Sequence, residues 1–251
     1  MIFVLLFVSI AFAQIQNLHQ GDFYYALRAQ DSKDNMANDK NVKQAINYYN
    51  LALKDSSTKQ EAAWKLLRAY YFLGCFSTPD LKKRIQLFEK AKKEGKLFLN
   101  TYPKDTEIAY WYSVNMGLWA SLINPAIALK AGSIKETREI AKMLIASEAT
   151  NKEAAARGYQ ILGKAHQKLP NIIFVSSWVK RDSAEYHYKK SLSLNPDDWA
   201  TRLFLAEYYK ENSKEKKMYE VLKPVSGKRP SPENYLEDER NIIKMKKLLA
   251  P

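Results

Sequence analysis

A fixed interval of 21 residues connects a small residue to a large one four times along this chain of 251 residues. In the clearest copy, Ala184 is followed by Tyr188, by Ser191, by Pro196 and, after 21 residues, by Leu205. The other three intervals run from Ala45 to Leu66, from Ala91 to Tyr112 and from Ala141 to Leu162. Successive alanines are 46, 50 and 43 residues apart, so the inner interval is constant while the outer spacing varies. This pattern predicts paired elements that are joined by connectors of different lengths.

The composition indicates that these elements are helices. Glycine and proline are scarce, at 8 and 9 residues, and no alternating strand pattern of useful length is present. The order small–aromatic–small, then proline, then Leu-small-x-x-Tyr resembles the tetratricopeptide pattern, in which helix B of one hairpin leads into helix A of the next. Small residues let helices approach closely, and aromatic rings fill the gaps. We therefore predict an all-α fold, an irregular tetratricopeptide-like α-solenoid of antiparallel helix pairs.

Three segments between helix A and helix B of a pair contain the extra residues that make the spacing of the repeats variable. Each segment contains residues that break helices. The segments are residues 77–81, 124–133 and 169–181. Helix starts are predicted at Asp80, at Thr150 or Asn151, and at Asn195-Pro196.

The ends of the chain differ from the repeats. Residues 235–249 are predicted to form a last amphipathic helix that caps the open end of the array. No domain boundary is visible, so we predict a single domain over residues 14–251. Residues 172–175, Ile-Ile-Phe-Val, are compatible with a short strand inside the third connector.

The first 13 residues have the pattern of a secretory signal peptide. Residues 2–13 are all apolar or small, and a helix of this length spans about 18 Å, well short of the ~30 Å hydrocarbon core of a membrane. Ala11, Phe12 and Ala13 form an A-x-A cleavage site before Gln14. We predict an exported chain, periplasmic or extracellular, that is soluble after cleavage. A basic segment ahead of the apolar run is missing, and a retained anchor or a mis-assigned start is the alternative.

The sequence lacks the patterns of enzymes and metal sites. Cys75 is the only cysteine, which excludes an intrachain disulfide and a cysteine-based zinc site. His19, His166 and His187 have no metal-ligand spacing, and no Walker loop or nucleophile elbow occurs. We predict no catalytic residue, no metal and no cofactor. His166 is expected to have a packing role, because it takes a repeat position that tyrosines take in other copies.

The net charge of +13 is spread along the chain. The densest stretch of cations is interrupted by Glu89 and Glu94. It contains Lys82, Lys83, Arg84, Lys90, Lys92, Lys93 and Lys96. We predict a solvated helix face here, with a docking surface for an acidic partner as the alternative. Nucleic acid is not an expected partner of an exported chain.

The segment around Trp111 provides the strongest candidates for binding. Tyr112, Met116 and Trp119 share one helix face, and Trp111 and Asn115 share the neighbouring one. Because the segment is apolar nearly all round, we expect a central helix. The amide of Asn115 needs a partner, which is either a structural group or a ligand.

Trp178 lies in the third connector, beside Lys180 and Arg181. It either packs as a lid on the Trp111 helix or lines a pocket mouth whose basic rim attracts an acidic ligand. Seven residues are predicted to form a ligand or partner groove. They are Trp111, Tyr112, Asn115, Trp119, Tyr159, Trp178 and Arg181.

Three stretches show a resemblance to known families: IAYWYSVNMGLWASL, then GYQILGKAHQKL followed by SSWVKRDSAEYHYKKSLSLNPDDW, then LFLAEYYKENSKEKKMYEVLKP. Over about residues 60–225, the chain resembles the periplasmic T-component of bacterial TRAP transporters and the related regulator of microtubule dynamics family. The resemblance implies an irregular α-solenoid without catalysis that binds proteins or a small apolar ligand. For the T-component it also implies trimers and a ligand channel.

We therefore expect an exported, non-catalytic binding protein that serves as an accessory component of a solute transporter. Its partner would be a protein of the envelope, such as the solute-binding subunit of the transporter. An apolar or organic-acid ligand and an oligomer are further expectations from the resemblance. The alternative is a general envelope scaffold that binds protein segments in its concave groove.

Overall fold

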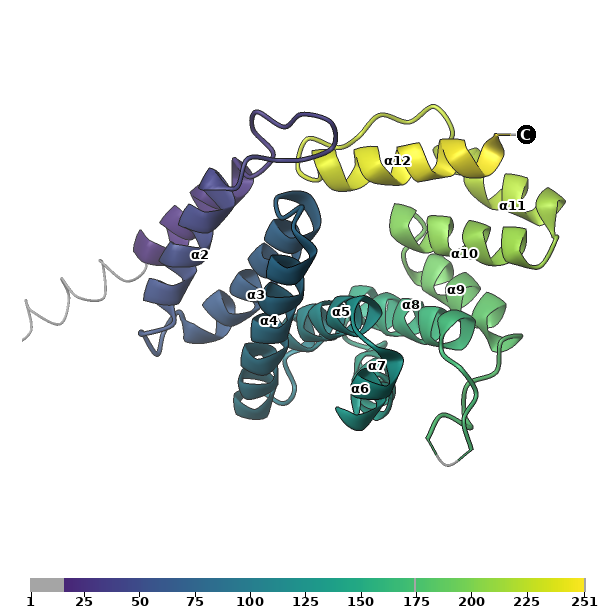
Figure 1. Ribbon diagram of the computed structural model, residues 1–251, viewed down its shortest axis with the longest axis horizontal. Helices are drawn as coiled ribbons and strands as arrows, with labels where there is room; N and C mark the ends of the chain where they lie inside the picture. The colour runs from purple at the N-terminus through teal and green to yellow at the C-terminus, as the bar shows by residue number, and fades with distance from the viewer. Residues whose placement is uncertain (1–15, 174, 251) are drawn as a thin grey trace, which may run out of the picture. The chain divides into compact units, whose positions relative to one another are not determined.

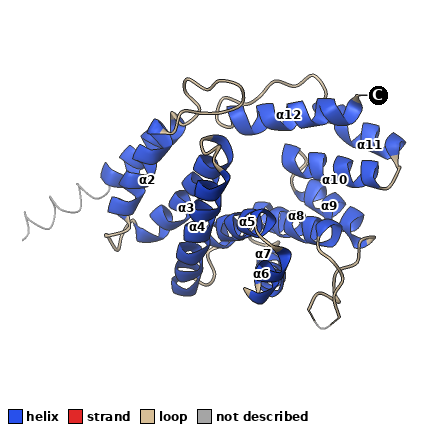
Figure 2. Cartoon of the chain, in the orientation of Figure 1, coloured by secondary structure: helices blue, strands red, loops and turns tan. Residues whose placement is uncertain are grey.

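The computed structural model describes residues 16–173 and 175–250, and the regular elements in these residues are helices (Figure 1, Figure 2). Within the described ranges, the one β feature is an isolated bridge between Lys33 and Met36. The chain divides into two compact units, and the division falls between Asn124 and Pro125. The predicted all-α class is therefore confirmed, whereas a single domain over residues 14–251 stays a prediction.

Unit 1 is built from helices that alternate between the helix A and helix B positions. The described residues 16–26 are helical and are followed by α2 (Lys40–Ala52), α3 (Lys59–Phe76), α4 (Leu81–Thr101) and α5 (Thr106–Leu122). Each of α2 to α4 packs on the next helix, and α3 also packs on α5. Residues 16–26, α3 and α5 take the helix A position, and α2 and α4 take the helix B position.

Unit 2 continues the same alternation and adds a cap. Its helices are α6 (Pro125–Lys130), α7 (Ser133–Ala146), α8 (Lys152–Lys168), α9 (Ser183–Leu194), α10 (Trp199–Glu211), α11 (Glu215–Leu222), the 3₁₀ turn η1 (Lys223–Val225) and α12 (Tyr235–Leu249). Helices α8 and α10 take the helix A position, and α7, α9 and α11 take the helix B position. Each of α7 to α11 packs on the next.

All four 21-residue intervals join a helix B to the following helix A. They connect α2 to α3, α4 to α5, α7 to α8 and α9 to α10, and all eight end residues are buried. The two helices of each pair pack against each other, so the predicted register is confirmed. We call the second residue of each interval a register residue. The register residues are Leu66, Tyr112, Leu162 and Leu205.

At two contacts between neighbouring helices, an aromatic ring on one helix packs against a glycine on the other. Gly163 of α8 lies against the ring of Tyr188 of α9, and a Cβ on Gly163 would be 2.5 Å from that ring. A contact in unit 1 joins helix B to the following helix A, with the glycine on α4 and the ring on α5. Gly95, four residues after Ala91, takes the position that Tyr188 has in its own copy, and a Cβ there would be 2.7 Å from the ring of Tyr112. Because both rings are buried, these contacts fix the distance between neighbouring helices.

Two of the predicted helix starts are confirmed by their caps. The side chain of Asp80 accepts a hydrogen bond from the backbone N–H of Lys83 at 2.7 Å and begins α4. Asn151 rather than Thr150 caps α8, by accepting the N–H of Ala154 at 2.9 Å. Each bond satisfies a donor that the first turn of a helix otherwise leaves unpaired.

The predicted start at Asn195-Pro196 is wrong by a few residues. Asn195 ends α9, and α10 begins only at Trp199. The cap is Asp198, whose carboxylate accepts the N–H of Ala200 at 2.9 Å. A proline disfavours the helical conformation in the residue before it, so the chain turns before the next helix begins.

The three predicted connectors lie between α3 and α4, between α5 and α7, and between α8 and α9. The second contains the short helix α6. The described residues of the run 172–175 form a turn and not a strand. Ser176 Oγ donates to the carbonyl of Pro170 at 2.6 Å and accepts the N–H of Ile172 at 2.9 Å, which closes this turn.

Helix α12 covers the end of unit 2. Its bounds are those predicted from the sequence, and it packs on α10 through Met245, which belongs to the core cluster that includes Leu203 and Tyr208. Lys210 of α10 donates to the carbonyl of Leu248 at 2.9 Å. The predicted signal peptide, residues 1–13, lies outside the described part of the chain. No helix within that part is long and apolar enough to span a bilayer.

Replacing Gly163 by alanine is expected to destabilise the protein by about 1–3 kcal/mol, because the new methyl group collides with the buried ring of Tyr188. Gly117→Ala is the matched control, since Gly117 also lies in a helix A and a Cβ there would meet nothing within 4 Å. This control is expected to be neutral or to stabilise by up to about 1 kcal/mol. Chemical denaturation measures both variants, and equal effects would contradict the tight contact.

Candidate partner-binding surface

One side of α3 presents a stripe of half-buried side chains. Trp64, Arg68, Tyr71 and Cys75 are spaced by four, three and four residues, so they lie on one side of the helix. Every other residue in the range 62–76 is buried. The stripe is therefore the only part of this stretch of α3 that solvent or a partner reaches.

Helix α5 extends the stripe through Trp111. The indole of Trp111 is half-buried, and its ring centre is 5.4 Å from that of Tyr71, with a tilt of 46°. We name Trp64, Arg68, Tyr71 and Trp111 the α3–α5 surface. Tryptophan, tyrosine and arginine are the residue types that most often dominate the binding energy of protein interfaces.

Aromatic rings hold the guanidinium of Arg68 in place. Its central carbon lies 4.2 Å from the ring centre of Tyr25 and 4.9 Å from that of Trp64. The guanidinium of Arg28 lies over the same Tyr25 ring at 4.3 Å. A cation over an aromatic face gains about 0.5–2 kcal/mol, so the stack fixes a positive charge at the α3–α5 surface.

Three of the predicted groove residues are core residues of unit 1. Tyr112, Asn115 and Trp119 are buried in α5. The amide of Asn115 donates to the carbonyl of Leu67 at 2.9 Å and to that of Trp111 at 2.8 Å. These bonds give Asn115 a structural partner, and a ligand role for the three residues stays a prediction. Sequence reasoning did not select Trp64, Arg68 and Tyr71, although their spacing on α3 was visible.

The other three predicted residues, Tyr159, Trp178 and Arg181, lie in unit 2. Trp178 is half-buried and meets the ring of His166 edge-on, with the ring centres 5.3 Å apart. Arg181 is exposed and pairs with Glu211 at 3.2 Å. The side chain of Tyr159 stacks on His187 of α9. Through Tyr159 and Trp178, helix α8 contacts both α9 and the third connector.

Two histidines form the centre of this cluster. The imidazoles of His166 and His187 are parallel within 3°, with their centres 4.8 Å apart. His166 Nδ1 accepts the backbone N–H of Lys180 at 2.9 Å, so His166 anchors the third connector, in agreement with its predicted packing role. Across residues 16–173 and 175–250, no group of histidine, cysteine, aspartate and glutamate side chains is placed to hold a metal ion.

Burial keeps both imidazoles neutral. It lowers the pKa of His166, with a smaller contribution from the positive charge of Arg138. It lowers the pKa of His187 to about 4, with a smaller contribution from His166. Protonation of either ring would place a charge in the stack, and protonation of His166 Nδ1 would break its bond to Lys180.

The dense stretch of cations lies on α4, where several of its charges have partners on the same helix. Lys93 pairs with Glu89 at 2.9 Å, and Lys90 pairs with Glu94 at 3.8 Å. Lys92 Nζ lies 3.3 Å from the ring centre of Trp119. The side chains of Lys90 and Lys93 are more than half exposed, as the prediction of a solvated helix face requires.

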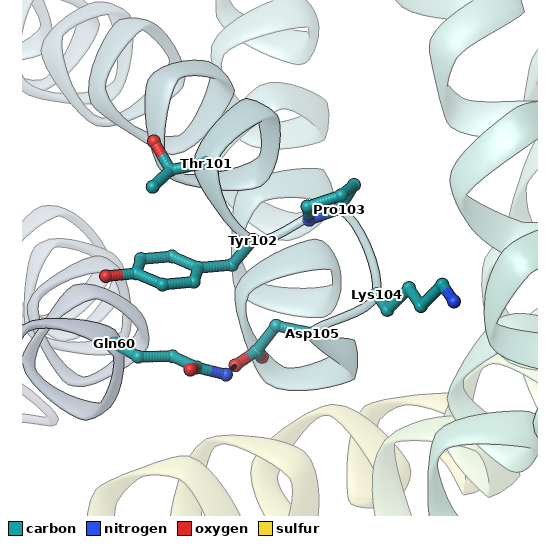
Figure 3. Close-up of a pocket in the computed structure, with 6 residues that line it drawn as sticks. All are labelled: Gln60, Thr101, Tyr102, Pro103, Lys104 and Asp105. Carbon is teal, nitrogen blue, oxygen red and sulfur yellow. Dashed lines mark hydrogen bonds between the residues drawn. The ribbon is translucent and has the colours of Figure 1, made fainter.

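A shallow depression of about 360 Å³ lies beside the turn between α4 and α5 (Figure 3). Gln60 and residues 101–105 line it. The amide of Gln60 donates to Asp105 at 2.7 Å, while Asp105 also accepts the N–H of Ile108 and caps α5. Lys104 points away from this pair (Figure 3). These polar groups connect α3 to the start of α5, so we assign the depression a structural role.

Comparison with known proteins places the chain in a family. The family model for Regulator of microtubule dynamics protein 1-3 matches residues 27–251. The chain belongs to this family. One of the two families named from the sequence is thus confirmed.

The fold also matches that of a solved tetratricopeptide-repeat protein. The crystal structure of TTC0263, a thermophilic TPR protein in Thermus thermophilus, aligns with a TM-score of 0.62 and 18% identity. The alignment covers 94% of this chain and 98% of that one, which confirms the tetratricopeptide-like fold class. A search of the curated proteins gives no match.

The imidazole cluster predicts a loss of stability in mild acid. The unfolded chain protonates its histidines below about pH 6.5, whereas His187 in the folded chain takes up a proton only near pH 4. The stabilising contribution of neutral His187 is therefore complete above about pH 6.5 and is lost as the pH falls towards 4. His187→Phe keeps an aromatic ring and removes this titration. Its denaturation midpoint is expected to fall less between these pH values than that of the wild type, and an unchanged pH dependence would rule out the contribution of His187.

Proposed function

We propose that this chain is a non-catalytic binding module that holds a segment of a partner protein on the α3–α5 surface. The observation that carries the proposal is that two neighbouring A helices form one surface. Helix α3 contributes Trp64, Arg68 and Tyr71, and α5 contributes Trp111. Around them the core of α3 is filled, yet these side chains stay half-buried. Such groups offer rigid contact area and a fixed charge, which suits recognition rather than proton transfer.

The helical-repeat fold supports this mode of action. Arrays of helix hairpins present the solvent-accessible sides of successive A helices as one surface, and partner segments bind along it. In unit 1 the tilted contact between Tyr71 and Trp111 joins α3 to α5 in this way. A segment that covers the surface would remove three large aromatic side chains from water, and burial of apolar area is the main driving force of association.

The finer proposal concerns the place and the partner. The apolar residues 2–13 and the A-x-A site support export, and the resemblance to the T-component supports an accessory role beside a solute transporter. The partner is then an envelope protein, for which a solute-binding subunit is the first candidate. The alternative is a general envelope scaffold that binds segments of several proteins.

The name of the family offers a different partner. It refers to microtubule dynamics, and a microtubule is a cytoplasmic partner with which an exported chain has no contact. The cellular location of the chain therefore separates the two proposals. A chain that begins at Gln14 outside the cytoplasm supports an envelope partner, and a cytoplasmic chain that retains residues 1–13 supports the other.

Site-specific crosslinking tests the binding surface. A photo-reactive amino acid at position 71 is expected to form adducts with a partner protein in cells of the source organism. The same amino acid at position 219, where Tyr219 is exposed on α11, is the matched control and is expected to give none of these adducts. Mass spectrometry of the adducts identifies the partner. Equal protein adducts at both positions, or lipid adducts alone at position 71, would contradict the proposal.

A further inference from the structure

A charged pair in unit 2 follows the helix register. Lys164 of α8 lies two residues after the register residue Leu162, and Glu207 of α10 lies two residues after Leu205. Lys164 Nζ and Glu207 Oε2 are 3.3 Å apart. The cation at this register position of one helix A is therefore neutralised by the equivalent position of the next.

Arg68 takes the same register position in unit 1, but the next helix A supplies no carboxylate there. Arg68 lies two residues after Leu66, and the equivalent residue of α5, two after Tyr112, is Val114. Among the described residues no carboxylate pairs with Arg68, and its Nε is buried without a hydrogen-bond partner. The neighbouring Lys65, in contrast, is paired with two carboxylates, each at 2.6 Å.

We propose that Arg68 binds a carboxylate of an acidic, extended segment of a partner protein, whose adjacent apolar side chains pack on Tyr71 and Trp111. This inference rests on the proposed function, because it concerns the same surface. A guanidinium matches a carboxylate with two parallel N–H···O bonds. The rings of Tyr25 and Trp64 already hold the guanidinium in place, so little conformational freedom is lost on binding.

The surroundings of Arg68 favour a single carboxylate over a polyanion. Lys65, which lies three residues before Arg68 on α3, holds the carboxylates of Asp22 and Glu61, so negative charge lies in this part of unit 1. Anionic membranes and nucleic acids need several cations together, and two nearby carboxylates would repel them. A peptide carboxylate needs one cation, and its neighbouring side chains meet half-buried aromatic rings rather than charges.

Selection from a library of short random peptides tests this assignment. The purified chain is expected to enrich peptides in which an aspartate or glutamate stands next to aromatic or aliphatic residues. Arg68→Gln is expected to lose the acidic preference and to bind the selected peptides at least about tenfold more weakly. Lys93→Gln removes the same charge from a surface pair on α4 and is the matched control, with no expected change. Thermal melts of the variants establish that each is folded.

Val114→Glu provides a second route to the same answer, without removing Arg68. It places a carboxylate at the position equivalent to Glu207 and is expected to weaken the binding of acidic peptides, whereas Val114→Gln is not. Acidic peptides that bind Arg68→Gln as tightly as the wild type would overturn the role of Arg68.

The outcomes separate this inference from the proposed function. The selected peptides could lack an acidic preference and still prevent crosslinking at position 71. That result would support the α3–α5 surface as the binding surface and would contradict only the role of Arg68. No enriched peptide at all would contradict both. Binding to phosphatidylglycerol vesicles that Arg68→Gln abolishes would overturn the assignment of a protein segment.

Discussion

The close contact of a bulky ring with a position that lacks a side chain determines how neighbouring helices pack in this protein. Tyr188 lies against Gly163 in unit 2, with the ring on helix B, and Tyr112 lies against Gly95 in unit 1, with the ring on helix A. The first contact joins helix A to helix B, α8 to α9, and the second joins helix B to the following helix A, α4 to α5. Because Gly95 and Tyr188 each lie four residues after the alanine that begins a 21-residue interval, these contacts orient their helices within the repeat pattern. That orientation decides which side chains of a helix A stay outside the core.

The candidate binding surface follows from this constraint. On α3 the core takes every residue of 62–76 except a stripe of four, and three of these are Trp64, Arg68 and Tyr71. Charged residues at equivalent register positions of the two units can also be compared. Arg68 and Lys164 each lie two residues after a register residue. Lys164 is paired with Glu207, whereas at the equivalent positions of unit 1, Arg68 and Val114, the sequence supplies no carboxylate. The net charge of the chain does not identify a binding residue by itself, and the comparison of equivalent register positions selects Arg68.

Much of the fold was predictable from the sequence because the pattern is set by packing. The intervals, the three connectors, the caps at Asp80 and Asn151, and the last helix all depend on local chemistry and on the spacing of small and large residues. The start of α10 was placed too early, since Asn195-Pro196 marks a turn that separates the end of α9 from the cap of α10. The division into two compact units has no signal in the sequence.

The candidate site was predicted only in part. The sequence drew attention to α5, because this helix is apolar nearly all round and contains two tryptophans. Aromatic content does not distinguish a core from a surface, and Trp119 proved buried while Trp111 is half-exposed. The spacing of Trp64 and Tyr71 places them on one side of a helix, but only the rotation of α3 within the fold shows that this side stays outside the core.

A double-mutant cycle between Gly95 and Tyr112 tests most directly whether matched bulk sets the helix register. The free energy of unfolding is measured for Gly95→Ala, for Tyr112→Leu and for the double variant. Gly95→Ala alone is expected to destabilise the protein by about 1–3 kcal/mol. It should cost much less when Tyr112→Leu has removed the ring, which gives a coupling of about 1 kcal/mol or more. Effects that add within about 0.5 kcal/mol would contradict the account.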